Sequence, residues 1–212
     1  MKIETLNPYV MRILISLRKE DSISSISTRI GLSYGWTQKW VRELIDEGIL
    51  KEKWRGVVVQ EKNQSYRRIL KFIGENLKNV GFYYAVLNLF GIEYGFTKTD
   101  AVYIWTEGRY NIARYKEFYP IHIKIKKEDY AIFLEYCKRL KLGVNLKRGI
   151  FYIPEILEDF KSVKKGKFYV EPLEETIKFM EKNIYNFMPA LEMIGKMYGK
   201  KVKIKYAEAS YF

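Results

Sequence analysis

Residues 32–50 read LSYGWTQKWVRELIDEGIL, and this segment is the most informative about the fold of the amino-terminal part. Ser33 can cap a helix, and apolar side chains follow it at helical spacing. Gly48 is a natural stop for that helix, and the apolar pair after this glycine is typical of the start of a strand. The pattern therefore predicts a helix that runs from Ser33 to about Glu47 and leads into a strand.

Two shorter helices are expected before this one. Residues 7–8, Asn-Pro, supply an N-cap and a proline at the first helical position, and apolar side chains continue at helical spacing to Leu17. A charged stretch follows, and then a short extended piece at residues 22–23. Ser24 can cap a second short helix, and Gly31 is its natural stop.

A β-hairpin is expected after the third helix. Residues 49–54 alternate partly between apolar and polar side chains, and residues 57–60 are rich in β-branched side chains. Arg55-Gly56 stands between them and predicts the turn. The complete order is helix, short strand, helix, turn, helix, hairpin.

This order resembles the winged helix-turn-helix family over about residues 5–62. In many such domains the recognition helix ends in a Leu, a few polar residues, a Gly and an apolar strand start, as residues 44–50 do here. The resemblance implies a domain that binds double-stranded DNA, with the third helix in the major groove. Winged helices also serve as protein–protein modules, so that alternative stays open.

Side chains of the third helix and of the hairpin supply the chemistry that DNA contact needs. Gln38 can pair with adenine edges, and Lys39 and Arg42 can reach guanine or phosphate. The start of the helix, with its backbone N–H groups and hydroxyls, favours a phosphate. The predicted DNA-binding residues are Ser33, Tyr34, Trp36, Gln38, Lys39, Arg42 and, at the tip of the wing, Arg55.

Several of these residues also have a purely structural interpretation. Trp36, like its neighbour Trp40, can belong to a core or an interface instead of reading bases. Lys39 and Arg42 can be solvated charges or can pair with the acidic side chains of the same helix, Glu43 and Asp46.

The charge of the chain points to a polyanionic partner without locating it. The formal net charge is +13, and nucleic acid is the first partner that such an excess favours. Residues 1–62 hold 11 Lys and Arg against 8 Asp and Glu, a net of +3, so the other 150 residues carry +10. A composition rich in Ile, Lys, Glu and Tyr, with three Gln, is also typical of hyperthermophile proteins, which makes background charge the alternative.

The rest of the chain is expected to be a mixed α+β region, so the predicted fold class is α+β, with an N-terminal winged helix-turn-helix followed by a mixed α+β C-terminal domain. We expect a domain at 1–62, a linker helix at 63–80 and an α+β domain at 81–212 that serves dimerisation, effector binding or partner binding. Helices are predicted at 65–79, 82–90, 128–140, from Pro172 onward, and at 189–198; strands are predicted at 101–105, 121–125, 149–153, 168–170 and, as an edge strand, 200–205.

A second resemblance extends over most of the chain. Residues 81–92, GFYYAVLNLFGI, and residues 170–177, VEPLEETI, are similar to segments that follow the winged helix in AbiEi-type antitoxins and their transcriptional-regulator relatives. Phe90 stands where that family usually has His. The ERT…D pattern that is frequent in the family is absent from this chain. The resemblance implies an autoregulating repressor and a protein partner, a nucleotidyltransferase toxin.

Residues for enzyme chemistry are scarce. A single His122 lies in an alternating strand pattern and a single Cys137 lies in a helical one, so a structural role is expected for both, with no metal site and no cofactor. No phosphate-binding glycine motif is present. We expect no catalytic activity, no membrane segment and a cytoplasmic location.

The leading hypothesis is therefore a sequence-specific regulator that binds double-stranded DNA, as an autoregulating repressor and a homodimer. The alternatives are an AbiEi-like antitoxin that neutralises a nucleotidyltransferase toxin, and a nonspecific nucleic-acid-binding protein whose aromatic side chains stack on bases.

Overall fold

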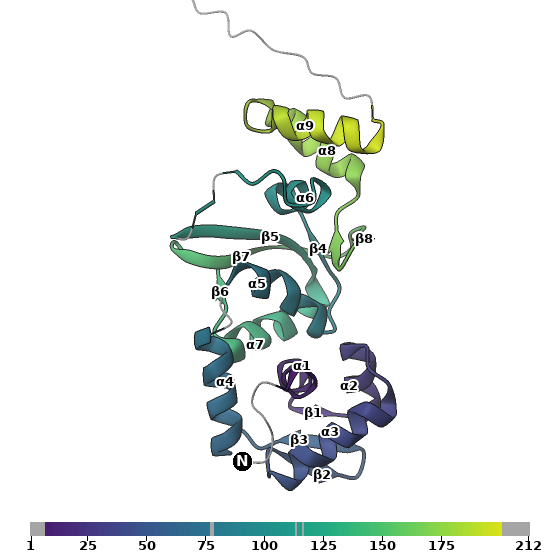
Figure 1. Cartoon of the computed structure of the whole chain (residues 1–212), viewed down its shortest axis with the longest axis vertical. Helices are drawn as coiled ribbons and strands as arrows, with labels where there is room; N and C mark the ends of the chain where they lie inside the picture. The colour runs from purple at the N-terminus through teal and green to yellow at the C-terminus, as the bar shows by residue number, and fades with distance from the viewer. Residues whose placement is uncertain (1–6, 77–78, 113, 116, 201–212) are drawn as a thin grey trace, which may run out of the picture. The chain divides into compact units, whose positions relative to one another are not determined.

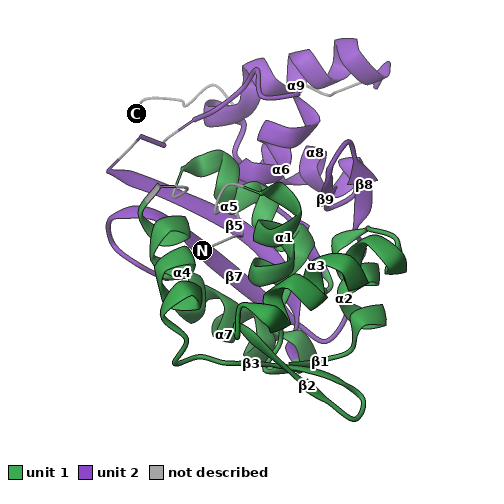
Figure 2. Cartoon of the chain, turned by 60° about the horizontal axis from the view of Figure 1, so that its bottom comes forward, with its two compact units in different colours: residues 1–93, 128–143 green, residues 94–127, 144–212 purple. Residues whose placement is uncertain are grey.

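A computed structural model describes residues 7–76, 79–112, 114–115 and 117–200, and it has the α+β architecture expected from the sequence (Figure 1). The chain divides into two compact units, one of residues 1–93 with 128–143 and one of residues 94–127 with 144–212 (Figure 2). The predicted domain ends at 62 and 80 do not coincide with this division.

The first unit begins with three helices and a small sheet. Three strands pair antiparallel in the order β1-β3-β2. The elements are α1 (Pro8–Ser16), β1 (Glu20–Asp21), α2 (Ile23–Ile30), α3 (Tyr34–Asp46), β2 (Leu50–Lys53) and β3 (Gly56–Val59). The predicted helix starts at Asn7-Pro8 and Ser33 are confirmed, as is the hairpin: the side chain of Asn7 accepts from two backbone N–H groups of α1, and that of Ser33 accepts from Trp36 N–H.

The start of α2 differs from the prediction. The extended piece is Glu20–Asp21 rather than residues 22–23, because Asp21 pairs with Val57 of β3. Ser22, not Ser24, is the N-cap, and its hydroxyl oxygen accepts from Ser25 N–H at 3.0 Å. Either serine satisfies the capping pattern in the sequence, and the pairing of β1 with β3 decides between them.

The first unit also contains helices from two distant parts of the chain. They are α4 (Gln64–Asn76), α5 (Val80–Val86) with the 3-10 turn η1 (Leu87–Leu89), and α7 (Tyr130–Leu140), which follows the 3-10 turn η2 (Lys127–Asp129). α7 holds the end of α1: the Tyr136 hydroxyl donates to Ser16 O, and the Arg139 guanidinium donates to Ile15 O at 2.6 Å and to Leu17 O. These donors satisfy carbonyls that the last turn of a helix leaves without partners.

The second unit is built on a mixed sheet. Its strands include β7-β5-β4-β9-β8 in that order; β5 pairs parallel with β7, and β4 pairs parallel with β9. The elements are β4 (Tyr94–Phe96), α6 (Lys98–Trp105), β5 (Phe118–Lys126), β6 (Gly143–Val144), where the chain re-enters this unit, β7 (Gly149–Leu157), β8 (Val163–Lys165), β9 (Phe168–Val170), α8 (Leu173–Lys182) and α9 (Ile184–Tyr198). An apolar cluster joins α6, α8 and α9.

Most elements predicted for this region are confirmed, and one is wrong. The strands at 121–125, 149–153 and 168–170 are present, and the last helix begins at Ile184 instead of 189, with Pro189 inside it. The predicted strand at 101–105 is helix α6, because burial against β5 and α8 outweighs the strand propensity of its β-branched and aromatic side chains. The predicted edge strand at 200–205 lies almost entirely outside the described residues.

Candidate nucleic-acid interface

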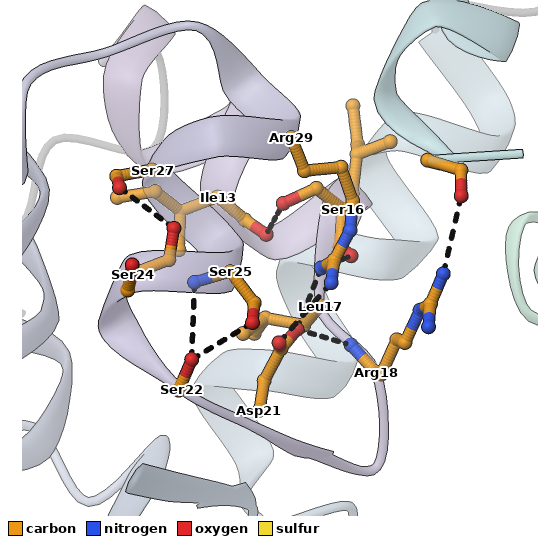
Figure 3. Close-up of polar contacts among 12 residues, drawn as sticks. Ile13, Ser16, Leu17, Arg18, Asp21, Ser22, Ser24, Ser25, Ser27 and Arg29 are labelled. Carbon is orange, nitrogen blue, oxygen red and sulfur yellow. Dashed lines mark hydrogen bonds and ion pairs between the residues drawn. The ribbon is translucent and has the colours of Figure 1, made fainter.

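A buried ion pair joins the last turn of α2 to β1, and its arginine also contacts the end of α1 (Figure 3). Arg29 donates to both carboxylate oxygens of Asp21, at 2.6 and 3.1 Å, and to Ser16 O at 2.7 Å. The two side chains are 6% and 3% exposed. Burial is the largest single influence and lowers the pKa of Arg29, but the hydrogen bond to Asp21 and the charges of Tyr136 and Asp21 together outweigh it, so the net shift of the pKa is upward. Because bidentate Arg–carboxylate geometry is specific, this pair holds the last turn of α2 against β1.

Gly56 allows strand β3 of the hairpin to pack closely against β1. Gly56 has a φ of +154°, and a Cβ atom there would lie 2.1 Å from the backbone oxygen of Asp21. Only glycine therefore allows β3 to approach β1 this closely. On the other strand of the hairpin, Lys53 forms an exposed ion pair with Glu20 at 2.5 Å. The position of the turn between β2 and β3 is thus tied to β1.

A groove of about 560 Å³ lies between α3, the start of α2 and the hairpin. Four of the seven predicted DNA-binding residues line it: Tyr34, Gln38 and Arg42 from α3, and Arg55 from the turn of the hairpin. Its other lining residues are Ser22–Ser24, Val41, Ile45 and Asp46, and Glu52–Lys53, Trp54 and Gly56–Val57. We call this surface the α3–hairpin groove.

The groove combines cations with groups that read or bind nucleic acid. Arg42, Lys53 and Arg55 contribute positive charge, and Asp46 and Glu52 contribute negative charge, so the lining has a net charge of +1. Tyr34 is 52% exposed and Arg42 is exposed, which leaves both accessible to a ligand. Within the described residues, no ion pair joins Arg42 or Lys39 to the acidic side chains of α3, Glu43 and Asp46.

The opposite side of α3 carries an aromatic cluster that we call the α1–α3 aromatic cluster. The ring of Tyr9 stacks on Trp36 at 5.8 Å and on Trp40 at 6.2 Å between ring centroids. The Lys39 ammonium lies 5.3 Å from the centroid of Trp36 and 5.1 Å from that of Trp40. Trp36 is still 52% exposed and Lys39 is exposed. Trp36 and Lys39 do not line the α3–hairpin groove. Ser33 does not line it either and caps the start of α3.

Trp54 is one of the groove residues that the sequence patterns do not identify as a candidate. Trp54, at the tip of the hairpin, is 96% exposed. Its neighbour Arg55 was predicted, but the apolar residue beside it carried no pattern that separates a surface tryptophan from a core one. The available signal was its position next to Arg-Gly in a short turn between two strands.

The single histidine is partly buried, and the single cysteine is buried. Asp100 accepts from His122 N–H at 2.7 Å, and the Arg114 guanidinium lies 2.5 Å from the same carboxylate. Thr99 Oγ1 lies 3.0 Å from His122 Nδ1. Cys137 is 2% exposed, and burial raises the pKa of its thiol. These contacts tie α6 to β5 and leave the thiol in an apolar environment.

No group of three or more His, Cys, Asp or Glu side chains there is placed to hold a metal ion. No helix among those residues has both the length and the apolar character needed to cross a bilayer.

Comparison of the chain with protein-family models, with curated proteins and with solved structures finds no match. The resemblances to the winged helix-turn-helix and AbiEi-type families therefore rest on the sequence segments that suggested them.

Proposed function

We propose that the chain is a transcriptional regulator that binds double-stranded DNA, with residues 7–59 acting as a winged helix-turn-helix. The observation that carries this proposal is the α3–hairpin groove, in which Tyr34, Gln38 and Arg42 lie on one wall and Arg55 on the other. The element order and the antiparallel β1-β3-β2 sheet support the same assignment.

The dimensions of α3 suit the major groove. The helix has 13 residues, which corresponds to about 20 Å, and a B-DNA major groove about 12 Å wide admits one helix. In this arrangement Gln38 and Arg42 face base edges, and the N–H groups at the start of α3 face a phosphate. Arg55 at the hairpin tip then lies toward the neighbouring groove or backbone.

We further propose that the protein works as a homodimer on an inverted repeat. Two half-sites about one helical turn apart multiply the discrimination of one helix. A single unit whose groove lining carries a net charge of +1 is weakly attractive to DNA, and a second copy supplies the missing affinity.

The test is a selection from a pool of random duplexes with the purified full chain. The enriched duplex and a shuffled version of it are then titrated at two salt concentrations. We expect an inverted repeat that is bound about a thousandfold more tightly than its shuffled control. Equal and steeply salt-dependent binding of both duplexes would instead support the nonspecific nucleic-acid-binding alternative. If no duplex is enriched and none binds, the proposal fails.

A further inference from the structure

The tip of the hairpin presents a tryptophan that the fold does not use. Trp54 is 96% exposed, the highest value among the exposed large apolar side chains of the described residues. A tryptophan offers an apolar surface of roughly 150–250 Å² for burial, and here almost all of it faces solvent. The ring therefore contributes little to the stability of the chain as it stands.

The turn itself does not require a tryptophan. Lys53 pairs with Gly56, so the loop consists of two residues, Trp54 and Arg55. Two-residue hairpin loops usually have Gly or Asn at positive φ, whereas neither of these residues has a positive φ. The close approach to β1 depends on Gly56 alone. The turn geometry therefore requires neither the Trp54 nor the Arg55 side chain.

The surroundings of the ring favour nucleic acid over an apolar protein surface. Trp54 lies between two cations, Lys53 and Arg55, and lines the α3–hairpin groove together with Arg42. An exposed ring flanked by cations is the combination that stacks on bases while the charges bind phosphates. No other large apolar side chain lies within the exposed run Lys51–Arg55, so the tip offers no apolar patch to a protein partner.

We propose that Trp54 inserts as a wedge against a base step in the DNA groove next to the one that holds α3, and that it bends the duplex there. Apolar wedges of this kind unstack a step partially and favour flexible pyrimidine–purine steps, so Trp54 adds specificity without a hydrogen bond to any base. This inference rests on the proposed function, because it needs α3 in the major groove.

The experiment uses the duplex enriched by the wild-type chain, labelled at both ends with a donor and an acceptor dye. Affinity, its dependence on salt and the energy transfer between the ends are measured for Trp54→Ala, Trp54→Phe and Arg55→Ala. Tyr185→Ala is the matched control, since Tyr185 is 75% exposed on α9 of the other unit. Thermal unfolding of each variant verifies that the exposed substitutions leave the fold intact.

We expect Trp54→Ala to bind about 10- to 100-fold more weakly and to leave the duplex straight. Its salt dependence should equal that of the wild type, because no phosphate contact is lost, whereas Arg55→Ala should reduce the slope. Trp54→Phe should retain most of the bend, and Tyr185→Ala should behave as the wild type.

Two results would overturn the inference while leaving the proposed function in place. One is a Trp54→Ala variant that binds and bends the duplex as the wild type does. The other is a loss of affinity accompanied by the same fall in salt slope as Arg55→Ala, which would mean that the ring only positions the arginine. A wild-type chain that binds no duplex would overturn both proposals together.

Discussion

The two sides of α3 are built from similar residue types but differ in what their polar ends contact. On the groove side, the guanidinium of Arg42 and the phenol of Tyr34 face an open surface shared with the hairpin. On the side of the α1–α3 aromatic cluster, the ammonium of Lys39 lies over the rings of Trp36 and Trp40. A basic residue on a helix is therefore not equivalent to its neighbour three positions away.

This difference predicts which side of α3 recognises DNA bases. A ligand that enters the groove meets cations, an amide and a helix start, whereas the aromatic cluster already uses its cation and rings in contacts with one another. We expect base discrimination from the groove side, and backbone attraction and helix packing from the cluster side.

The largest effect is expected from breaking the pair that holds the groove wall. Asp21→Asn removes the carboxylate that Arg29 contacts and leaves a buried guanidinium without its counter-charge. We expect a loss of about 3–5 kcal/mol in the free energy of unfolding. Denaturant unfolding monitored by circular dichroism measures it.

The control for this change is Asp159→Asn, whose side chain is 84% exposed and lies 3.6 Å from Lys126. It should alter the free energy of unfolding by no more than about 1 kcal/mol. Equal effects of the two substitutions would contradict the structural role given to the Asp21–Arg29 pair.

The next effect concerns DNA affinity. Arg42→Ala combined with Arg55→Ala removes one cation from each wall of the groove, and we expect a loss of about 2 kcal/mol or more in binding free energy to the selected duplex. Arg68→Ala with Arg109→Ala removes the same net charge from exposed positions outside the groove lining. Fluorescence anisotropy titrations compare the two double variants, and similar losses would reduce the groove to a patch of background charge.

A smaller effect should separate Lys39 from Arg42. Lys39→Ala removes a cation that contacts two rings, so we expect a loss of about 0.5–1 kcal/mol in stability. Any loss of DNA affinity should be uniform across sequences, with the salt slope reduced by about 1, as for a phosphate contact. Arg42→Ala should relax specificity instead. Titration of matched and single-mismatch duplexes distinguishes the two patterns, and relaxed specificity in Lys39→Ala would erase the distinction.

The smallest effect is expected at Trp36. Trp36→Ala removes the stacking contact with Tyr9, which is worth about 0.5–1.5 kcal/mol of stability. A base that stacked on Trp36 would make the same variant lose about 1–3 kcal/mol of binding free energy. We expect the binding loss to stay below that range. A loss of binding free energy within that range would mean that the α1–α3 aromatic cluster takes part in base recognition.

Local patterns predicted the parts of the fold that depend on a few adjacent residues. Asn7-Pro8 and Ser33 each have the side chain that an N-cap needs, and both are N-caps. The alternation at 121–125 predicted β5, because one face of that strand is buried. These features do not depend on distant segments.

The features that escaped prediction depend on contacts far apart in the sequence. The local pattern of residues 101–105 predicts a strand, but packing against β5 and α8 makes them part of helix α6. Helix α7 belongs to the first unit, where Tyr136 and Arg139 contact α1, which lies more than 100 residues earlier in the chain. Four residues that line the α3–hairpin groove can be named from the sequence, and their role in binding stays a prediction, whereas no periodicity distinguishes the exposed Trp54 from a buried tryptophan.

If DNA occupies the α3–hairpin groove, hydrogen exchange of that segment should change when DNA binds. Deuterium uptake of the full chain would be measured by mass spectrometry with and without the selected duplex. We expect slower exchange with the duplex in peptides that cover residues 22–24, the start of α3 and residues 50–59. Unchanged exchange in all of these segments, in a sample where titration shows the duplex bound, would mean that the DNA does not occupy the α3–hairpin groove and binds elsewhere on the chain.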